Sequence, residues 1–392
     1  MIDYNKILSN KILQVKPSGI RKFFDIAAEM EGVISLGVGE PDFDTPYSVR
    51  QAGIKSLEEG KTWYTANAGL APLREGIARY LQRRFDGLTY DPSDEILVTV
   101  GGSEAIDIAI RTLVDPGDEV IIPEPSFVCY TPIVQLAGGV PVPIPTREEN
   151  EFRLTAQELK DALTERTKLL VLPFPNNPTG AVMERRHLEE IAQVLRGTDV
   201  MVLSDEIYAE LTYGGLKHTP FAAIEGMWER TITVNGFSKA FAMTGWRLGY
   251  ACCPAPILAQ MKKAHQFAIM CAPTVSQYAA LEAINNCDDS IEEMKEEYDS
   301  RRRYIVDAFN KLGLPCFTPK GAFYVFPCIR STGMSSAQFC EELLYSKKIA
   351  VVPGDAFGES GEGFIRVSYS YSLSHLKKAI KRIGEFLEER QG

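Results

Sequence analysis

Residues 230–253 read RTITVNGFSKAFAMTGWRLGYACC, two short apolar runs separated by a polar segment that contains Lys239. The runs are apolar almost throughout and do not alternate with polar residues, which is typical of strands covered on both faces. A lone lysine is most often a solvated surface charge. Lys239 therefore needs support from the rest of the chain before a functional role can be assigned to it.

Four more runs of the same kind precede this stretch, and amphipathic segments such as HLEEIAQVLRG lie between them. The four runs are EILVTV, DEVIIPEP, KLLVLPFP and DVMVLSDEIY. Alternation of strand, crossover helix and strand predicts a mostly parallel sheet with helices on both faces. We therefore expect a large α/β domain over residues 48–285.

The C-terminal third of the chain has a different character. A long charged helix is expected over DDSIEEMKEEYDSRRRYIVDAFNKLG, followed by short strands around GAFYVFP, IAVVPG and FIRVSYS and by a final amphipathic helix. This pattern indicates a smaller α+β domain, built from residues 286–392 together with residues 1–47.

Composition narrows the class of protein. A net charge of −10 and a pI near 5.2 argue against a nucleic-acid surface, which needs clustered basic residues. No apolar stretch is long enough to span a bilayer, and the first residues lack the apolar core of a signal peptide, so we expect a cytoplasmic protein without a membrane partner. The eight cysteines form no C-x-x-C pair and the four histidines show no ligand spacing, so we expect no metal site.

Polar residues follow the apolar runs, at the carboxyl ends of strands where open α/β sheets bind ligands. They are Gly102, Ser103, Glu104, Phe127, Asn176, Asn177, Asp205, Tyr208 and Lys239. The first three belong to VTVGGSEAIDIAI, in which glycines precede the expected start of a helix. Glycine lets a phosphate come close to the backbone N–H groups at such a helix start, although a plain tight turn explains the stretch equally well. The fingerprints of dinucleotide and ATP phosphate sites are absent from the sequence.

Asp205 and Lys239 suggest what else such a ligand carries. A carboxylate at the buried edge of a sheet needs a cation or strong donors, and a structural cap or local ion pair would also satisfy it. Lysine, with a pKa of about 10.4, is a poor nucleophile at neutral pH unless burial or a nearby cation such as Arg247 lowers that value. A ligand with an aldehyde, a ring nitrogen and a phosphate would use the lysine, the carboxylate and the glycine-rich helix start together. Pyridoxal 5′-phosphate is such a cofactor.

The sequence is similar along essentially its whole length to class I aminotransferases of pyridoxal-phosphate fold type I. It most resembles the bacterial and archaeal aspartate and aromatic aminotransferase group. The motifs that carry the resemblance, in the family's order, are SLGVGEPDFDTP, YTANAGLAPLREGIA, GGSEA, NNPTG, SDEIYAEL, SKAFAMTGWRLGY, KGAFYVFP and FIRVSYS.

The resemblance implies a role for each residue around the cofactor ring. Lys239 matches the lysine that forms the Schiff base, and Asp205 matches the carboxylate that keeps the ring nitrogen protonated. Tyr208 and Asn177 match the residues that bind the phenolic oxygen, and Phe127 matches the aromatic that stacks on the ring. Of these, Lys239, Asp205 and Tyr208 are the expected catalytic residues.

The resemblance also implies residues for the phosphate, the substrate and a second subunit. The positions matched to the phosphate are Gly102, Ser103, Glu104 and Arg247. Arg366 matches the arginine that binds the substrate α-carboxylate through a planar fork, with Gly39 and Asn177 beside it. Tyr64 matches a tyrosine that reaches the phosphate of the neighbouring subunit, which implies a homodimer with shared active sites.

Two positions depart from the family pattern. Gly236 stands where many relatives have a serine or threonine that contacts the phosphate. Ser103 stands where some aspartate-specific members carry a lysine for the distal carboxylate, which weakens a dedicated aspartate specificity. The side-chain pocket of this family draws on the segment KPSGIRKFF, residues 16–24, in which no residue indicates one specificity.

We therefore expect ping-pong transamination between an L-amino acid, aromatic favoured, and a 2-oxo acid, with 2-oxoglutarate the expected acceptor. An aspartate or alanine aminotransferase with the same mechanism is the alternative, and a carbon–sulfur β-lyase on the same scaffold is a more distant one. A non-catalytic regulator would need an added DNA-binding module, for which the chain has no spare length. A plain α/β binding protein would have no reason to keep Lys239, Asp205 and Arg366 together.

Overall fold

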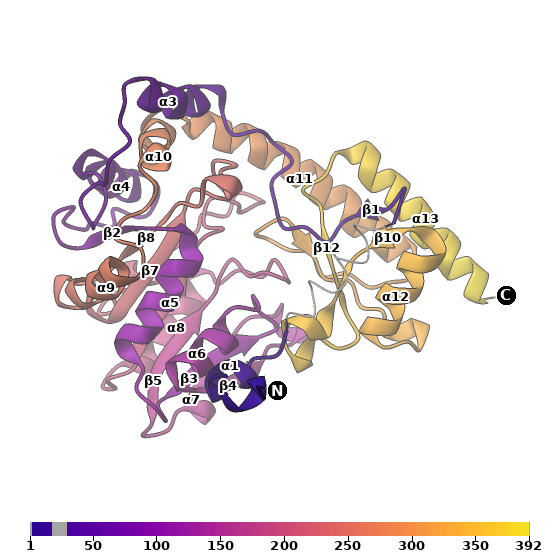
Figure 1. Ribbon diagram of the computed structural model, residues 1–392. Helices are drawn as coiled ribbons and strands as arrows, with labels where there is room; N and C mark the ends of the chain where they lie inside the picture. Colours follow the sequence, from indigo (N-terminus) through magenta and orange to yellow (C-terminus); the bar gives the residue numbers. More distant parts are fainter. Residues whose placement is uncertain (1, 18–29, 392) are drawn as a thin grey trace.

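The computed structural model describes residues 2–17 and 30–391, arranged as a large and a small body (Figure 1). The large body is built on a seven-stranded sheet in the order β2-β8-β7-β6-β5-β3-β4. Only β8 runs antiparallel to its neighbours, so the prediction of a mostly parallel sheet is confirmed. The strands are β2 (Ile96–Thr99), β3 (Glu119–Glu124), β4 (Val140–Pro145), β5 (Thr167–Leu172), β6 (Met201–Asp205), β7 (Thr231–Gly236) and β8 (Gly249–Cys252).

The central strands are buried on both faces, as their continuous apolar runs predict. In β5, Leu169 and Val171 belong to one hydrophobic core, whereas Leu170 and Leu172 belong to another on the opposite face. The helices of the large body are α3 (Tyr47–Glu58), α4 (Ala71–Arg84), α5 (Gly101–Leu113), α6 (Tyr130–Ala137), α7 (Ala156–Ala162), α8 (Arg185–Leu195), α9 (Ala255–Ala268) and α10 (Thr274–Asn286). Full burial of alternate residues on both faces explains why the runs lack a polar face.

The edge strand β4 was missed by the sequence analysis. Its sequence VPVPIP carries a proline at every second position, and proline lacks the N–H that a strand interior donates. Because β4 pairs only with β3, the side of the strand without a partner accommodates the prolines.

The small body combines helices with two short sheets. In one sheet β12 (Ile365–Ser368) lies between β9 (Tyr324–Val325) and β11 (Val352–Pro353), antiparallel to both; in the other, β1 (Ile34–Ser35) pairs in parallel with β10 (Ile349–Ala350). Its helices are α11 (Asp288–Lys311), α12 (Ser336–Lys347) and α13 (Leu373–Gln391). The pairing of β1 with β10 brings the early part of the chain to the C-terminal third, while the domain boundaries at 47/48 and 285/286 stay a prediction.

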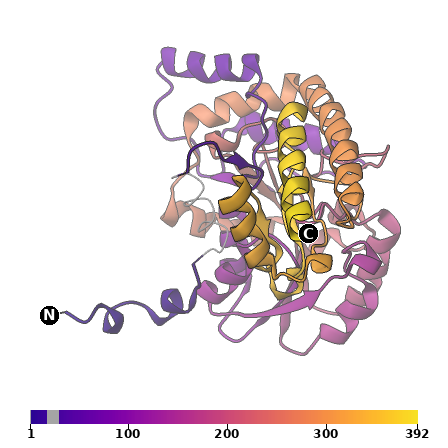
Figure 2. The same cartoon turned by 90° about the vertical axis from the view of Figure 1, so that its right-hand side faces the viewer.

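The N-terminal segment that contains α1 (Asn10–Gln14) extends away from the rest of the chain (Figure 2). It touches the large body where the Lys11 ammonium donates to the carbonyl of Leu136 in α6. Within residues 2–17 and 30–391, no helix has both the length and the apolar character that crossing a membrane would require.

A segment that we call the strap, residues 37–45, joins the two bodies. At one end the Thr45 hydroxyl donates to the carbonyl of Ala242 in the large body. Further along, Arg301 of α11 forms an ion pair with Asp42, with 2.7 Å between Nη1 and Oδ1, and lies over the ring of Phe43. The strap is thus fixed to both bodies.

The start of α5 packs tightly against β8. A Cβ atom built on Gly249 would lie 2.6 Å from backbone atoms of Gly101 and Gly102, much closer than real Cβ contacts. The absence of a side chain at this position lets the helix start approach the sheet.

We predict that Gly249→Ala lowers the free energy of unfolding by about 1–3 kcal/mol, the usual cost of overpacking against atoms that cannot move aside. Urea unfolding of the cofactor-free protein measures this loss. Gly245→Ala is the matched control, because a Cβ there meets open space. An unchanged urea midpoint for Gly249→Ala would contradict the close packing.

Candidate active site

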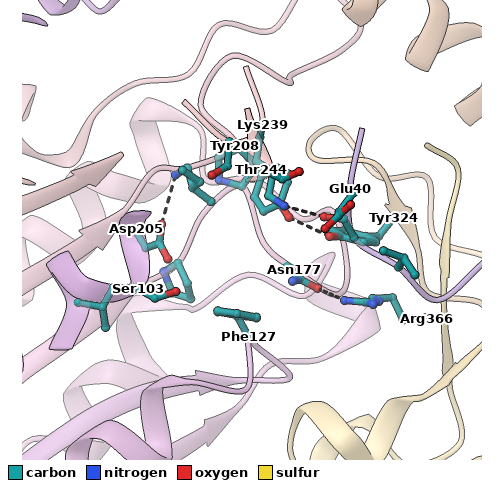
Figure 3. A pocket seen from close by; sticks show the side chains of 18 of the residues that line it. Glu40, Ser103, Phe127, Asn177, Asp205, Tyr208, Lys239, Thr244, Tyr324 and Arg366 are labelled. Atoms are coloured by element: carbon teal, nitrogen blue, oxygen red, sulfur yellow. Dashed lines mark hydrogen bonds between the residues drawn. The ribbon is translucent and has the colours of Figure 1, made fainter. Parts of the chain in front are cut away.

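A cavity of about 640 Å³ opens between the carboxyl ends of the large sheet, the strap and the strands β9 and β12. Most of the predicted site residues lie on its wall: Gly39, Gly102, Ser103, Phe127, Asn177, Asp205, Tyr208, Lys239, Arg247 and Arg366. Figure 3 shows Asp205 and Ser103 on one side, Arg366 and Tyr324 on the other, and Lys239 with Tyr208 between them. Side chains from positions far apart in the sequence therefore meet in one cavity.

The Lys239 ammonium lies inside this cavity and not on the outer surface. Its Nζ donates to the carbonyl oxygen of Gly39 in the strap at 2.6 Å and lies 5.8 Å from the ring centre of Tyr208. Burial lowers the pKa of Lys239 to about 8; Glu40 opposes the shift, and the positive charges of Arg366 and Arg247 add to it. An amine with this pKa is a far better nucleophile at neutral pH than an ordinary lysine.

Asp205 ends β6 with its carboxylate buried. Oδ2 accepts from the Tyr130 hydroxyl at 2.7 Å and Oδ1 from the Ile207 N–H at 3.2 Å. Burial raises the pKa of Asp205, and these two hydrogen bonds hold it down in part. No ion pair of Asp205 occurs within the described ranges, so the carboxylate is open to a cationic ligand group.

The helix start at Gly102 and Ser103 lines the cavity. Arg247 adopts a left-handed backbone conformation with φ of 53°, and its guanidinium lies beside Gly101, where a Cβ would come within 2.7 Å of Nη2. Backbone N–H groups at the start of a helix, together with an arginine guanidinium that packs against glycine, form a site that suits a phosphate.

Glu104, which was predicted beside them, turns away from the cavity. Its carboxylate accepts from the Val100 N–H and faces Nδ1 of the fully buried His265 at 2.7 Å. The side chain therefore stabilises the start of α5 and joins it to α9, and only the backbone of Glu104 is left for a phosphate contact. A glutamate in the first turn of a helix is favourable in either role, so the sequence alone could not separate them.

Tyr64 also lies outside the cavity, with 75% of its surface exposed. Trp63, Phe267, Ile269 and Met270 are exposed as well, and two hydrogen bonds join their segments: Asn67 donates to Met270 and Thr274 donates to Trp63. The reach of Tyr64 into a neighbouring subunit stays a prediction.

Arg366 is buried opposite Asp205 without a carboxylate partner in the part of the chain that the structure describes. Its Nη1 donates to Asn177 Oδ1 at 2.9 Å (Figure 3), and its Nη2 donates to the carbonyl of Gly37. Nε has no hydrogen-bond partner among the described residues, and the guanidinium lies 4.5 Å from the ring centre of Tyr324. A buried guanidinium without an acid is a receptor for an anionic group.

Among the wall residues that the sequence did not indicate, three contact or lie near predicted site residues. Tyr130 holds Asp205, Tyr324 contacts Tyr208, and Glu40 lies near Lys239. Tyr324 belongs to the quoted motif KGAFYVFP and Glu40 to SLGVGEPDFDTP, so a signal was present without a role attached to it. The predicted side-chain pocket segment is largely outside the described residues, which omit residues 18–29.

Comparison with known proteins identifies relatives of this arrangement. The family described as aminotransferase class I and II matches residues 31–383. A relative from Bacillus subtilis (strain 168) named YugH is 56% identical over 97% of this chain and 98% of its own length. The aspartate aminotransferase of Pyrococcus abyssi is 47% identical over 98% of this chain and 99% of its own. The crystal structure of the aromatic aminotransferase from Pyrococcus horikoshii OT3 superposes with a TM-score of 0.90 at 45% identity, covering 95% of this chain and 99% of that one.

The lowered pKa of Lys239 generates a prediction for the protein without any ligand. The unprotonated amine is the reactive form, so labelling of Lys239 by acetic anhydride should rise with pH around a midpoint of about 8, measured by mass spectrometry of its peptide. An ordinary lysine reaches this midpoint near about 10.4.

Glu40→Gln should move the Lys239 midpoint lower still, because it removes a negative charge that favours the ammonium form. A midpoint of Lys239 above 10 in the unaltered protein would contradict its burial beside the two arginines.

Proposed function

The chain belongs to the class I and II aminotransferases and is a transaminase, and we propose that it binds pyridoxal 5′-phosphate in the cavity around Lys239. The observation that carries this proposal is the placement in one cavity of three charged side chains that form no ion pair with any residue the structure describes. Lys239 offers an amine, Asp205 a carboxylate and Arg366 a guanidinium. These are the groups that a cofactor aldehyde, a cofactor ring nitrogen and a substrate carboxylate need.

The remaining wall residues fit the same cofactor. Phe127 offers an aromatic face, and Asn177 and Tyr208 offer donors for the phenolic oxygen. Gly102 and Ser103 with Arg247 suit the phosphate, since Gly101 keeps the space beside the guanidinium free. Tyr130 keeps Asp205 ordered, so that its carboxylate is held for the ring nitrogen.

Bound pyridoxal phosphate supplies an aldehyde that takes up amines and a protonated ring that draws electrons from the substrate Cα. Lys239 would hold the cofactor through its amine and, when a substrate amino group takes its place, would accept and return the proton at Cα. Asp205 keeps the ring nitrogen protonated. Arg366 would bind the substrate α-carboxylate through its planar guanidinium and so orient the amino acid in the cavity.

We propose an aromatic amino acid as the favoured donor and 2-oxoglutarate as the acceptor. The wall of the cavity contains Phe127, Tyr130, Ile207 and Tyr324, and of these Tyr324 lies against Arg366 at the substrate end, where its ring suits an apolar side chain. The cations on the wall are Lys239, Arg247 and Arg366, and each already has a proposed task. Similar proteins are named for aspartate as well as for aromatic amino acids, so aspartate is the second candidate, with alanine and a carbon–sulfur β-lyase behind it.

We also propose that two copies of the chain share their active sites. Tyr64 lies outside its own cavity, among the exposed apolar residues Trp63, Phe267, Ile269 and Met270. A patch of this kind is usual for a protein–protein interface. A cytoplasmic location stays a prediction from the sequence.

The proposed cofactor predicts a yellow protein whose visible band bleaches when an amino acid donor is added. Tyrosine and phenylalanine should bleach it at lower concentrations than aspartate or alanine. Absorption spectra recorded during titration with single amino acids measure the order. Release of pyruvate and ammonia from a cysteine conjugate would support the β-lyase, and the absence of any visible band with added cofactor would refute the proposal.

Lys239→Ala should still bind the cofactor but no longer retain it after borohydride reduction, because the covalent link is lost. Turnover should fall by about 10²–10⁴-fold or more, the range of general acid–base contributions. Lys262→Ala, at an exposed position of α9, is the control and should behave like the unaltered enzyme. Normal turnover by Lys239→Ala would end the assignment.

Arg366→Lys should raise KM for the amino acid at least tenfold. Lysine keeps the positive charge but cannot form two parallel hydrogen bonds to a carboxylate. Steady-state kinetics with an amino acid and with the corresponding amine, which lacks the carboxylate, separate the effect. A similar loss for both substrates would show that Arg366 acts through packing alone.

A further inference from the structure

Tyr324 is a buried tyrosine whose hydroxyl meets that of Tyr208 inside the cavity. The two oxygen atoms are 2.8 Å apart, and the rings meet edge to face with 5.9 Å between their centres (Figure 3). Tyr208 belongs to the large body, close behind β6, whereas Tyr324 belongs to β9 of the small body. The hydrogen bond therefore crosses from one body to the other.

The Tyr324 hydroxyl is held in place from several sides. A Cβ atom on Gly39 would lie only 2.2 Å from this oxygen, so the strap leaves no room for it to move in that direction. The Arg366 guanidinium covers the ring at 4.5 Å, and Tyr324 pairs with Ser368 across β9 and β12. With 1% of its surface exposed, Tyr324 has one fixed position.

Hydrogen-bond counting decides which hydroxyl donates. A tyrosine hydroxyl has one hydrogen to donate and can also accept. Among the described residues, Tyr324 is the partner of the Tyr208 hydroxyl. If Tyr208 donates its hydrogen to the phenolic oxygen of the cofactor, the hydrogen between the two tyrosines must come from Tyr324. Burial raises the pKa of both tyrosines, so both keep their protons at neutral pH.

We propose that Tyr324 is a positioning residue that holds and polarises the Tyr208 hydroxyl as a donor to the ring oxygen of the cofactor. The proposal rests on the proposed function of the cavity. Tyr324 does not touch the reacting atoms; it acts through Tyr208. Hydrogen bonds in a chain strengthen one another by about 10–30% per bond, so the Tyr324 hydroxyl makes Tyr208 a better donor.

A packing role is the alternative, because Tyr324 lies among aromatic rings, including Phe323 and Tyr208. The two roles separate in Tyr324→Phe, which keeps the ring and removes only the hydroxyl. Packing predicts no change in the electronic state of the cofactor, whereas positioning predicts a specific change.

The test is a pH titration of the visible absorption band of the cofactor-loaded enzyme. A hydrogen bond from Tyr208 stabilises negative charge on the ring oxygen, so weakening that bond raises the pKa at which the band changes. Tyr208→Phe should raise this titration midpoint most. Tyr324→Phe should raise it in the same direction by a few tenths of a pKa unit, a fraction of the Tyr208 effect.

A double variant and a control variant sharpen the result. In the Tyr208→Phe background, Tyr324→Phe should add no further shift, because the hydroxyl through which it acts is gone. Tyr369→Phe removes another fully buried hydroxyl, which does not line the cavity. This hydroxyl donates to the carbonyl oxygen of Ala322, with 3.0 Å between the two oxygen atoms. It should lower stability and leave the midpoint unchanged.

Each failure has a distinct signature. If the unaltered protein shows no visible band, the proposed function fails. If the band is present and Tyr208→Phe shifts it while Tyr324→Phe does not, Tyr324 is a packing residue and the inference fails alone. Equal shifts for Tyr324→Phe in both backgrounds would also overturn it, since its effect would then bypass Tyr208.

Discussion

Parallel pairing of β6 with β7 is the constraint on which the site depends. The register places Asp205, the last residue of β6, opposite Val234 in β7, so the polar residues that follow both strands emerge at the same edge of the sheet. Lys239 follows β7 by three residues, and Tyr208 follows β6 at the same distance. A shift of this register by one residue would turn Asp205 to the other face and separate it from the cavity.

The cavity concentrates charges that a stable fold would normally pair. Neutral groups hold each of the three charged side chains by a hydrogen bond. Lys239 donates to Gly39, Asp205 accepts from Tyr130, and Arg366 donates to Asn177. Such burial without ion pairs among the described residues opposes folding, and the surrounding apolar cores of the two bodies must offset it. Functional sites commonly break the rule that buried charges are paired, because the unpaired charges form a pre-arranged receptor for a ligand.

Much of the fold and of the site could be predicted from the sequence, because both obey short-range rules. Continuous apolar runs marked the central strands, and the residues directly after them marked the wall of the cavity. What was missed depends on contacts between distant segments. Tyr130 and Tyr324 look like ordinary core tyrosines until the fold brings them to Asp205 and Tyr208. Glu104 was matched to the phosphate site as part of the helix start, and no local pattern reveals that its side chain faces His265, which lies 161 residues further along the chain.

The strap has a consequence for the order in which the protein is made. Arg366 donates to the carbonyl of Gly37, which lies 329 residues earlier in the sequence. In the same way, β1 can form its strand pair only after β10 has been synthesised. During synthesis the whole large sheet leaves the ribosome before Arg366 and β10 do, and domains fold as units as they emerge. The nascent chain therefore carries Lys239 and Asp205 in a half-built receptor, in which the Gly37 end of the strap still lacks its contact with Arg366. Only the last part of synthesis closes it, so a prematurely terminated chain can expose the amine but cannot orient an amino acid.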